Sequence, residues 1–272
     1  MGKIVCIANQ KGGVGKTTTA INLSASLAIE GKPTLLIDCD PQGNASSGVG
    51  INVKNVHKSI YHALVLDESF DQIVRKTAIN LLCVAPSNID LVGAEIELVN
   101  INNREKRLWK ILFGVIDKYE YIVIDCPPSL GLLTINSLVA ADSVLIPIQC
   151  EYYALEGVGQ LLRTIKLMKK VFNPKLKLEG LLLTMFDVRN NLSHRVAEEI
   201  KKHFSHILFD TIIPRNVRLG EAPSFGKPVI LYDKSSRGAI RYMDLAREIL
   251  QNKGNLYEKK RGFREGFSGA DS

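Results

Sequence analysis

The segment from Lys3 to Thr19 constrains this chain more than any other stretch of its sequence. It begins with a short apolar run, passes through a turn that holds three glycines, and ends where a helix is expected to start. Glycines allow unusual backbone conformations and let backbone N–H groups approach a ligand closely. A strand, a glycine-rich loop and a helix in this order predict a site for phosphate groups, because a helix N-terminus attracts anions.

Individual positions of this loop fit the chemistry of a nucleotide. Lys16 is expected to reach the outer phosphates, and the Thr17 hydroxyl is expected to bind Mg²⁺. The usual motif G-x-x-x-x-G-K-[ST] requires glycine at position 10, where this chain has Gln10. The chain adds Lys11 directly before its glycine pair. A turn that merely joins a strand to a helix is the alternative, and the flanking elements favour the phosphate site.

Two more apolar runs end in carboxylates, which is where an open α/β sheet places its chemistry. Thr34–Ile37 leads into Asp38 and Asp40, and Tyr121–Ile124 leads into Asp125. A carboxylate at the place of Asp125 holds the Mg²⁺ of a nucleotide site, often through water. For Asp38 and Asp40, turn formation and helix capping are the alternative.

The chain alternates between predicted strands and helices throughout. This alternation predicts an α/β fold: a mostly parallel, twisted sheet flanked by helices on both faces. The segment that runs to Gly50 and the segment Pro127–Gly131 are predicted to be mobile switches, with Gly131 as a hinge. We expect one domain over residues 1–253 and a disordered tail over residues 254–272, which hold few apolar side chains.

Three local predictions are specific enough to be checked against a structure. Residues 58–76 are predicted to form short surface helices. Residues 104–118 are predicted to form one helix, on which Trp109 is a packing residue. Residues 212–218 are predicted to form a strand and a turn.

Charge and cysteine content narrow the class of protein further. The net charge is +7, yet residues 1–150 hold 13 basic and 14 acidic side chains, whereas residues 151–272 hold 22 and 14. The second half therefore favours a polyanion as partner, nucleic acid more than membrane, although an incidentally basic surface is the alternative. The five cysteines show no C-x-x-C spacing and predict small buried side chains in a reducing cytoplasm. No apolar run has the ~20 residues that span a membrane, and no signal peptide is evident.

Several separate motifs resemble those of the deviant phosphate-loop ATPases: Lys11–Thr17, Asp38–Gly43 and Ile124–Pro128. Two more, Gln149–Glu156 and Ile213–Leu219, are similar to the chromosomal ParA/Soj branch of that class. The resemblance extends over roughly residues 1–250 and therefore concerns nearly the whole chain.

This resemblance implies a Mg²⁺-dependent ATPase with weak intrinsic activity, whose ATP-bound homodimer holds two nucleotides between its subunits. Lys11 would reach across to the partner's phosphates, Lys16 would neutralise phosphate charge, and Asp40 would orient the attacking water. Thr17 would ligate Mg²⁺, and Asp125 would hold it through water. The ATP-binding residues would be Lys11, Gly12, Gly13, Val14, Gly15, Lys16, Thr17, Thr18, Pro214 and Asn216.

The resemblance also implies partners and a cellular role. The dimer would bind double-stranded DNA without sequence preference, and a centromere-binding protein of the ParB type would stimulate hydrolysis and release. The protein would then be cytoplasmic and nucleoid-associated, without stable membrane anchoring, and would segregate replicated chromosomes or plasmids. Arg and Lys contacts to phosphates give such sequence-independent binding. The candidate DNA-binding residues are Arg189, Arg218, Lys227, Lys234, Arg237 and Arg241.

Four other functions share parts of this sequence pattern. A MinD-like ATPase that positions the division site at the membrane needs an amphipathic C-terminal helix, which the glycines of residues 261–269 disfavour. An iron–sulfur scaffold or nitrogenase-type reductase needs clustered cysteines. A plasmid-type ATPase with an operator-binding domain needs more than the ten residues that precede Lys11. A DNA-binding module without enzymatic activity would not need every hydrolysis position filled.

Overall fold

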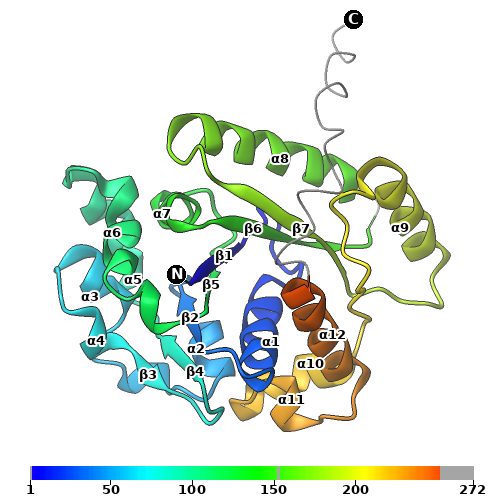
Figure 1. Ribbon diagram of the computed structural model, residues 1–272, viewed down its shortest axis with the longest axis horizontal. Helices are drawn as coiled ribbons and strands as arrows, with labels where there is room; N and C mark the ends of the chain where they lie inside the picture. The colour runs from blue at the N-terminus through cyan, green and yellow to red at the C-terminus, as the bar shows by residue number, and fades with distance from the viewer. Residues whose placement is uncertain (1, 152–153, 252–272) are drawn as a thin grey trace, which may run out of the picture.

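A computed structural model describes residues 2–151 and 154–251 of the chain. At its centre is a seven-stranded sheet with the strand order β3-β4-β2-β5-β1-β6-β7 (Figure 1). All neighbouring strands run parallel except β3, which is antiparallel to β4. The strands are β1 (Lys3–Ile7), β2 (Thr34–Asp38), β3 (Arg75–Lys76), β4 (Leu82–Ala85), β5 (Tyr121–Asp125), β6 (Ser143–Gln149) and β7 (Lys177–Thr184).

Helices cover both faces of this sheet, so the predicted α/β architecture is confirmed (Figure 1). The α-helices among the described residues are α1 (Lys16–Ile29), α2 (Asn44–Gly48), α3 (Ile60–Val65), α4 (Phe70–Ile73), α5 (Leu91–Glu97), α6 (Arg107–Phe113), α7 (Leu132–Ala140), α8 (Ala154–Val171), α9 (Asn191–Phe204), α10 (Val217–Glu221), α11 (Val229–Tyr232) and α12 (Arg237–Gln251).

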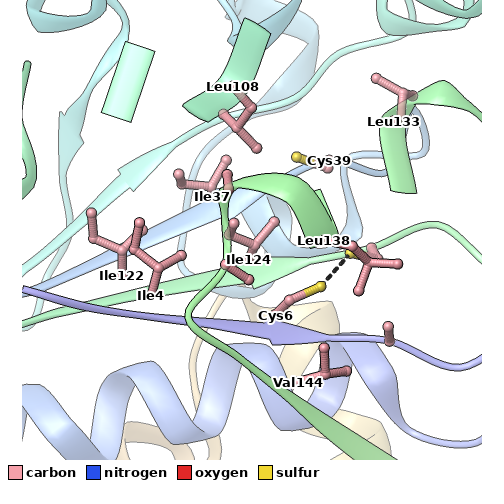
Figure 2. Close-up of a cluster of buried hydrophobic side chains, with 14 of the residues drawn as sticks. Ile4, Cys6, Ile37, Cys39, Leu108, Ile122, Ile124, Leu133, Leu138 and Val144 are labelled. Atoms are coloured by element: carbon pink, nitrogen blue, oxygen red, sulfur yellow. Dashed lines mark hydrogen bonds between the residues drawn. The ribbon is translucent and has the colours of Figure 1, made fainter. Parts of the chain in front are cut away.

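The interior positions of the central strands β1, β2 and β5 are apolar because each face of the sheet is buried. Successive side chains of a strand point to opposite faces. Ile4 and Cys6 of β1 therefore join one core, with α6 and α7, while Val5 and Ile7 join the other, with α1 and α12. Figure 2 shows the first core, in which side chains of α6 and α7 such as Leu108 and Leu138 cover the strands.

The prediction of buried cysteines is confirmed for four of the five. Cys6, Cys39, Cys126 and Cys150 are buried, Cys83 is half-buried, and all five are free thiols. The sulfur atoms of Cys6 and Cys126 lie 3.2 Å apart in the core shown in Figure 2. A hydrogen bond to Cys126, together with burial, raises the pKa of the Cys6 thiol well above its ordinary value. Such thiols are unreactive packing groups.

The predictions for residues 58–76 and 104–118 are confirmed only in part. Residues 58–76 form α3 and α4 but end in the antiparallel edge strand β3, which was not predicted. The single helix predicted over residues 104–118 is wrong, because α6 ends before Gly114 and short 3₁₀ turns flank it. Trp109 lies 48% exposed and contacts the ring of Phe113, so it packs at the surface.

The strand predicted over residues 212–218 is also wrong. Only an isolated bridge joins Pro214 to Phe186, and Asn216 already caps α10. The bridge consists of two backbone hydrogen bonds, from the N–H of Phe186 to Ile213 and from the N–H of Arg215 to Phe186, and α10 begins shortly after it, at Val217. The predicted tail over residues 254–272 lies outside the described residues, and the single domain over residues 1–253 stays a prediction. Within the described part of the chain, no helix is long and apolar enough to cross a membrane.

Candidate functional site

The glycine-rich loop lies between β1 and α1, at the carboxyl edge of the sheet. Gly13 and Gly15 have φ angles of 75° and 89°, in the left-handed region that favours glycine. Gly12 is outside that region, so backbone conformation requires only two of the three glycines. Gly15 caps α1 without a side-chain hydrogen bond, and the first turn of α1 holds no acidic residue. The free backbone N–H groups at the N-terminus of α1 are thus suited to bind an anion.

Lys16 is held inside this loop although it is the first residue of α1. Only 7% of its surface is exposed, and its Nζ donates a hydrogen bond to the backbone oxygen of Lys11 at 2.9 Å. Burial lowers the pKa of Lys16, and the negative charge of Asp125 partly opposes this change. A buried ammonium that bonds a backbone carbonyl is a strong binding group for a phosphate that replaces this carbonyl.

The two carboxylates predicted at strand ends lie side by side. Asp38 and Asp125 are register partners at the ends of β2 and β5, and both are fully buried. Neither carboxyl oxygen of Asp125 has a hydrogen-bond partner of normal geometry among the described residues. Burial, followed by the charge of Asp38, raises the pKa of Asp125 well above its ordinary value, and the Thr17 side chain opposes the shift. An unpartnered buried carboxylate next to a threonine hydroxyl fits a hydrated Mg²⁺ ion.

Asp38 and Asp40 have different surroundings. One oxygen of Asp38 accepts hydrogen bonds from the backbone N–H and the hydroxyl of Ser46, both at 2.7 Å. Burial raises the pKa of Asp38 to about 6 although these bonds oppose the shift. Asp38 therefore anchors α2, as the capping alternative predicts. Asp40 is half-buried and accepts one hydrogen bond, from the backbone N–H of Gln42 at 2.9 Å.

Lys11 is on the outside of the same loop. Its side chain is 53% exposed, and its ammonium forms an ion pair with Glu151 of the same chain. The structure thus places the two lysines of the loop in opposite environments, one buried at the carboxylates and one directed to solvent. Such an exposed ion pair contributes little to stability and exchanges readily.

Three polar residues hold the loop in place, and of these only Gln10 was named from the sequence. The Asn9 amide donates to the backbone oxygen of Pro147 at 2.7 Å, and its oxygen accepts from the N–H of Lys11 at 3.0 Å. The Thr184 hydroxyl donates to the backbone oxygen of Val14 at 2.8 Å, and Gln10 donates to Thr164 at 3.2 Å. The position of Asn9 just beyond the end of β1, with Ala8 between them, was the one available signal.

The structure brings the segment that holds Pro214 and Asn216 toward the loop. Pro214 pairs with Phe186, which follows Met185 at the end of β7. A Cβ built on Gly15 would lie 3.9 Å from the Met185 Cε atom, so this strand end borders the loop. Asn216 accepts a hydrogen bond from the backbone N–H of Arg218 at 2.9 Å and thereby caps α10.

The candidate DNA-binding residues are all exposed, but several are paired with acids. The Arg189 guanidinium binds both oxygens of Asp187 at 3.0 Å. Arg218 pairs with Glu221 at 2.8 Å and with Asp233 at 3.4 Å. Arg241 pairs with Asp244, whereas Lys227, Lys234 and Arg237 form no ion pair with another described residue. Most of these residues lie on or beside α10, α11 and α12, which are neighbours in Figure 1.

Comparisons with known proteins show which family this chain resembles. Residues 2–178 match the AAA domain family. A chromosome partitioning protein ParA from Myxococcus xanthus is 58% identical over 251 residues, which cover 92% of this chain and 89% of that protein. The sporulation initiation inhibitor protein Soj from Bacillus subtilis is 58% identical over 252 residues, which cover 93% of this chain and all of that protein.

Among solved structures, cobyrinic acid a,c-diamide synthase from Mycobacterium smegmatis, crystallised with ADP and magnesium, superposes with a TM-score of 0.81. It is 36% identical, and the match covers 93% of this chain and 95% of that one. The cell division ATPase MinD from Pyrococcus furiosus has a TM-score of 0.77 at 24% identity, which shows a shared fold alone.

The parallel sheet, the glycine-rich loop and the AAA domain match define a P-loop ATPase. Within that class, the chain belongs to the ParA/Soj family of chromosome-partitioning proteins.

Proposed function

We propose that this protein is a Mg²⁺-dependent ATPase that segregates replicated chromosomes or plasmids. In this proposal an ATP-bound sandwich homodimer binds double-stranded DNA without sequence preference, and a ParB-type centromere-binding protein stimulates hydrolysis and release. The observation that carries the proposal is the buried, unpartnered carboxylate of Asp125 beside Thr17 and Lys16, directly under the glycine-rich loop.

The residues of the glycine-rich loop and of the other candidate segments have separate roles in this proposal. The backbone N–H groups of residues 11–18 cradle the phosphates, and Lys16 exchanges the carbonyl of Lys11 for a phosphate oxygen. Thr17 and, through water, Asp125 hold Mg²⁺, which neutralises phosphate charge when bound. Asp40, which is half-buried on the loop between β2 and α2, orients the attacking water. Pro214 and Asn216 contact the adenine end.

Lys11 supports an active site completed by a second subunit. Its side chain is 53% exposed, and its ammonium forms an exposed ion pair with Glu151. In the dimer it leaves this ion pair for the phosphates of the partner's nucleotide. Without the partner, part of the charge stabilisation for phosphoryl transfer is absent, so intrinsic hydrolysis is slow.

DNA binding in this proposal uses the basic residues around α10–α12 together with Arg189. Its physical support is the excess of basic side chains in the second half of the chain and the exposure of the six candidates. The name of the Myxococcus relative, a chromosome partitioning protein, supports a role in chromosome partition. The protein would then be nucleoid-associated while it holds ATP.

The test is ATP hydrolysis measured with Mg²⁺ alone, with added DNA, and with DNA plus the ParB-type protein of the same genome. We expect slow hydrolysis alone and at least tenfold stimulation, on the order of one missing transition-state contact, when both are present. Hydrolysis that is fast for the isolated protein and insensitive to both additions would contradict the proposal. Sedimentation with liposomes serves as the control for membrane binding.

A further inference from the structure

A carboxylate from another helix holds the first turn of α7. The N-cap of α7, Gly131, has no side-chain acceptor, and no acidic residue lies in the first turn. Glu95 of α5 supplies the missing acceptors. Its Oε2 accepts from the backbone N–H of Leu132 at 2.8 Å, and its Oε1 accepts from that of Leu133 at 3.3 Å. These bonds satisfy donors that a helix start leaves free, and they place negative charge at the positive end of the helix.

The residue at position 131 leaves room for this contact. Gly131 has φ −80° and ψ −172°, an extended conformation that any residue adopts. A Cβ built there would lie 2.3 Å from Oε1 and 2.6 Å from Oε2 of Glu95. Glycine is therefore explained by the close approach of Glu95, which gives position 131 a reason other than the predicted hinge.

The contact lies at the far end of the segment that follows Asp125. That segment, residues 126–131, connects the end of β5 to α7 and includes the predicted switch Pro127–Gly131. The Thr134 hydroxyl, in the first turns of α7, donates to the backbone oxygen of Ser129 at 2.6 Å. Fixing the start of α7 consequently fixes the segment as well, because its two ends are then both held.

We propose that Glu95 is a positioning residue for ATP hydrolysis, which clamps α7 and thereby holds residues 127–131 in the arrangement that hydrolysis requires. The inference rests on the ATPase function proposed above. Loss of the clamp leaves the N–H groups of Leu132 and Leu133 without their acceptor, and the first turn of α7 opens more often. Catalysis depends on such pre-organised geometry more steeply than binding does. The turnover number is therefore the quantity that falls.

The test compares Glu95→Ala and Glu95→Gln with Gly131→Ala and the control Glu97→Ala. Glu97 is on the same helix, but its carboxylate accepts from the Tyr61 hydroxyl, at 3.0 and 3.1 Å. Amide hydrogen exchange is followed in the nucleotide-free full-length protein, over peptides that cover residues 126–135. Turnover and ATP affinity are measured on the same preparations, and thermal unfolding confirms that each variant is folded.

For Glu95→Ala we expect exchange in residues 126–135 to accelerate about tenfold or more, with α12 unchanged. We expect kcat to fall about tenfold while the Kd for ATP stays within about twofold. Gly131→Ala should reproduce both effects, because its Cβ displaces the Glu95 carboxylate. Glu95→Gln should lie between, because its amide oxygen still accepts, and Glu97→Ala should match the parent.

Unchanged exchange and unchanged kcat in Glu95→Ala would overturn the inference, as would equal losses in Glu97→Ala. The two proposals fail in distinguishable ways. A parent protein that does not hydrolyse ATP would refute the proposed function, whereas the exchange measurement judges the clamp without nucleotide.

Discussion

Lys11 and Lys16 lie five residues apart in one loop, yet the fold gives them opposite surroundings. Lys16 is buried against the carbonyl of Lys11, and the charge of Asp125 is among the groups that act on its pKa. Lys11 is exposed and paired with Glu151. In the proposed function the buried lysine binds the chain's own nucleotide, because its desolvated ammonium gains most from a phosphate. The exposed lysine is free to exchange its partner.

Replacing Lys16 by alanine should weaken ATP binding by about 10- to 100-fold, because a charged hydrogen bond to phosphate contributes about 1.5–3 kcal/mol. Isothermal titration of the nucleotide into the folded variant measures this change. Lys32→Ala, at an ion pair with Glu120 far from the loop, is the control and should bind ATP as the parent does. Normal affinity in Lys16→Ala would remove the phosphate-binding assignment.

Asp40→Ala should keep ATP binding but lower hydrolysis about 100-fold or more, because a group that positions or deprotonates water contributes on that scale. The half-buried carboxylate bonds only the backbone N–H of Gln42 among its described neighbours, so little stability should be lost. Phosphate release at saturating ATP gives the rate, and gel filtration with ATP reports the dimer. Parental hydrolysis by this variant would assign the water-positioning role elsewhere.

At the scale of elements, the basic surface is shaped by acids that lie beside it. Arg189 is tied to Asp187, and Arg218 is tied to Glu221 and Asp233. Hydrogen bonds from Arg189 lower the pKa of Asp187 to about 2, so this acid stays charged at any pH of interest. DNA phosphates would have to compete with these carboxylates. Binding is then expected to be weak for each residue and to depend on the sum of several contacts.

The double substitution Arg189→Glu with Arg218→Glu should reduce DNA binding about tenfold or more at 0.1 M salt, and should lower the salt dependence by about one phosphate contact per arginine. The control is Lys169→Glu with Lys170→Glu on α8, which makes the same change in charge on a helix distant from α10 (Figure 1). Both variants should dimerise with ATP. Equal DNA loss in the two variants would indicate a general charge effect rather than a defined surface.

At the scale of the whole molecule, the two buried carboxylates of the candidate site lower the stability of the folded state. Two carboxylates, Asp38 and Asp125, end adjacent strands inside one buried layer, and burial raises the pKa of both. The folded state therefore keeps protons that the unfolded chain has already released above pH ~4. It follows that the stability of the nucleotide-free protein falls as pH rises from about 4 through the folded pKa of about 6 for Asp38.

Asp125→Asn should consequently stabilise the nucleotide-free protein at pH 7.5, by about 1–3 kcal/mol, because it removes a buried group whose ionisation is opposed. Urea unfolding at pH 7.5 measures the gain. The same titration at pH 5 is the internal control, since the difference from the parent should shrink there. A variant less stable than the parent at pH 7.5 would show that the Asp125 carboxylate contributes net stability before any ion binds.

Much of the architecture could be predicted from the sequence. Strand and helix positions follow from periodicity, and the apolar runs of β1, β2 and β5 predict a parallel sheet buried on both faces. The glycine-rich loop, Lys16 and the carboxylates at strand ends are local patterns. Each of them can be recognised from a few consecutive residues. Predictions failed where a distant segment decides the outcome: the segment that holds Pro214 forms only an isolated bridge to Phe186, and β3 forms because β4 offers an edge.

Only the tertiary structure decided how these pieces act on one another. It placed Asp125 beside Asp38, paired Lys11 with Glu151, fastened Val14 to Thr184, and set Glu95 against the start of α7. Each of these contacts joins residues far apart in the sequence, and their partners carry no local signature. The reason is physical: propensity and periodicity act over a few residues, whereas burial, charge and hydrogen bonding depend on what the completed fold brings within 3 to 4 Å.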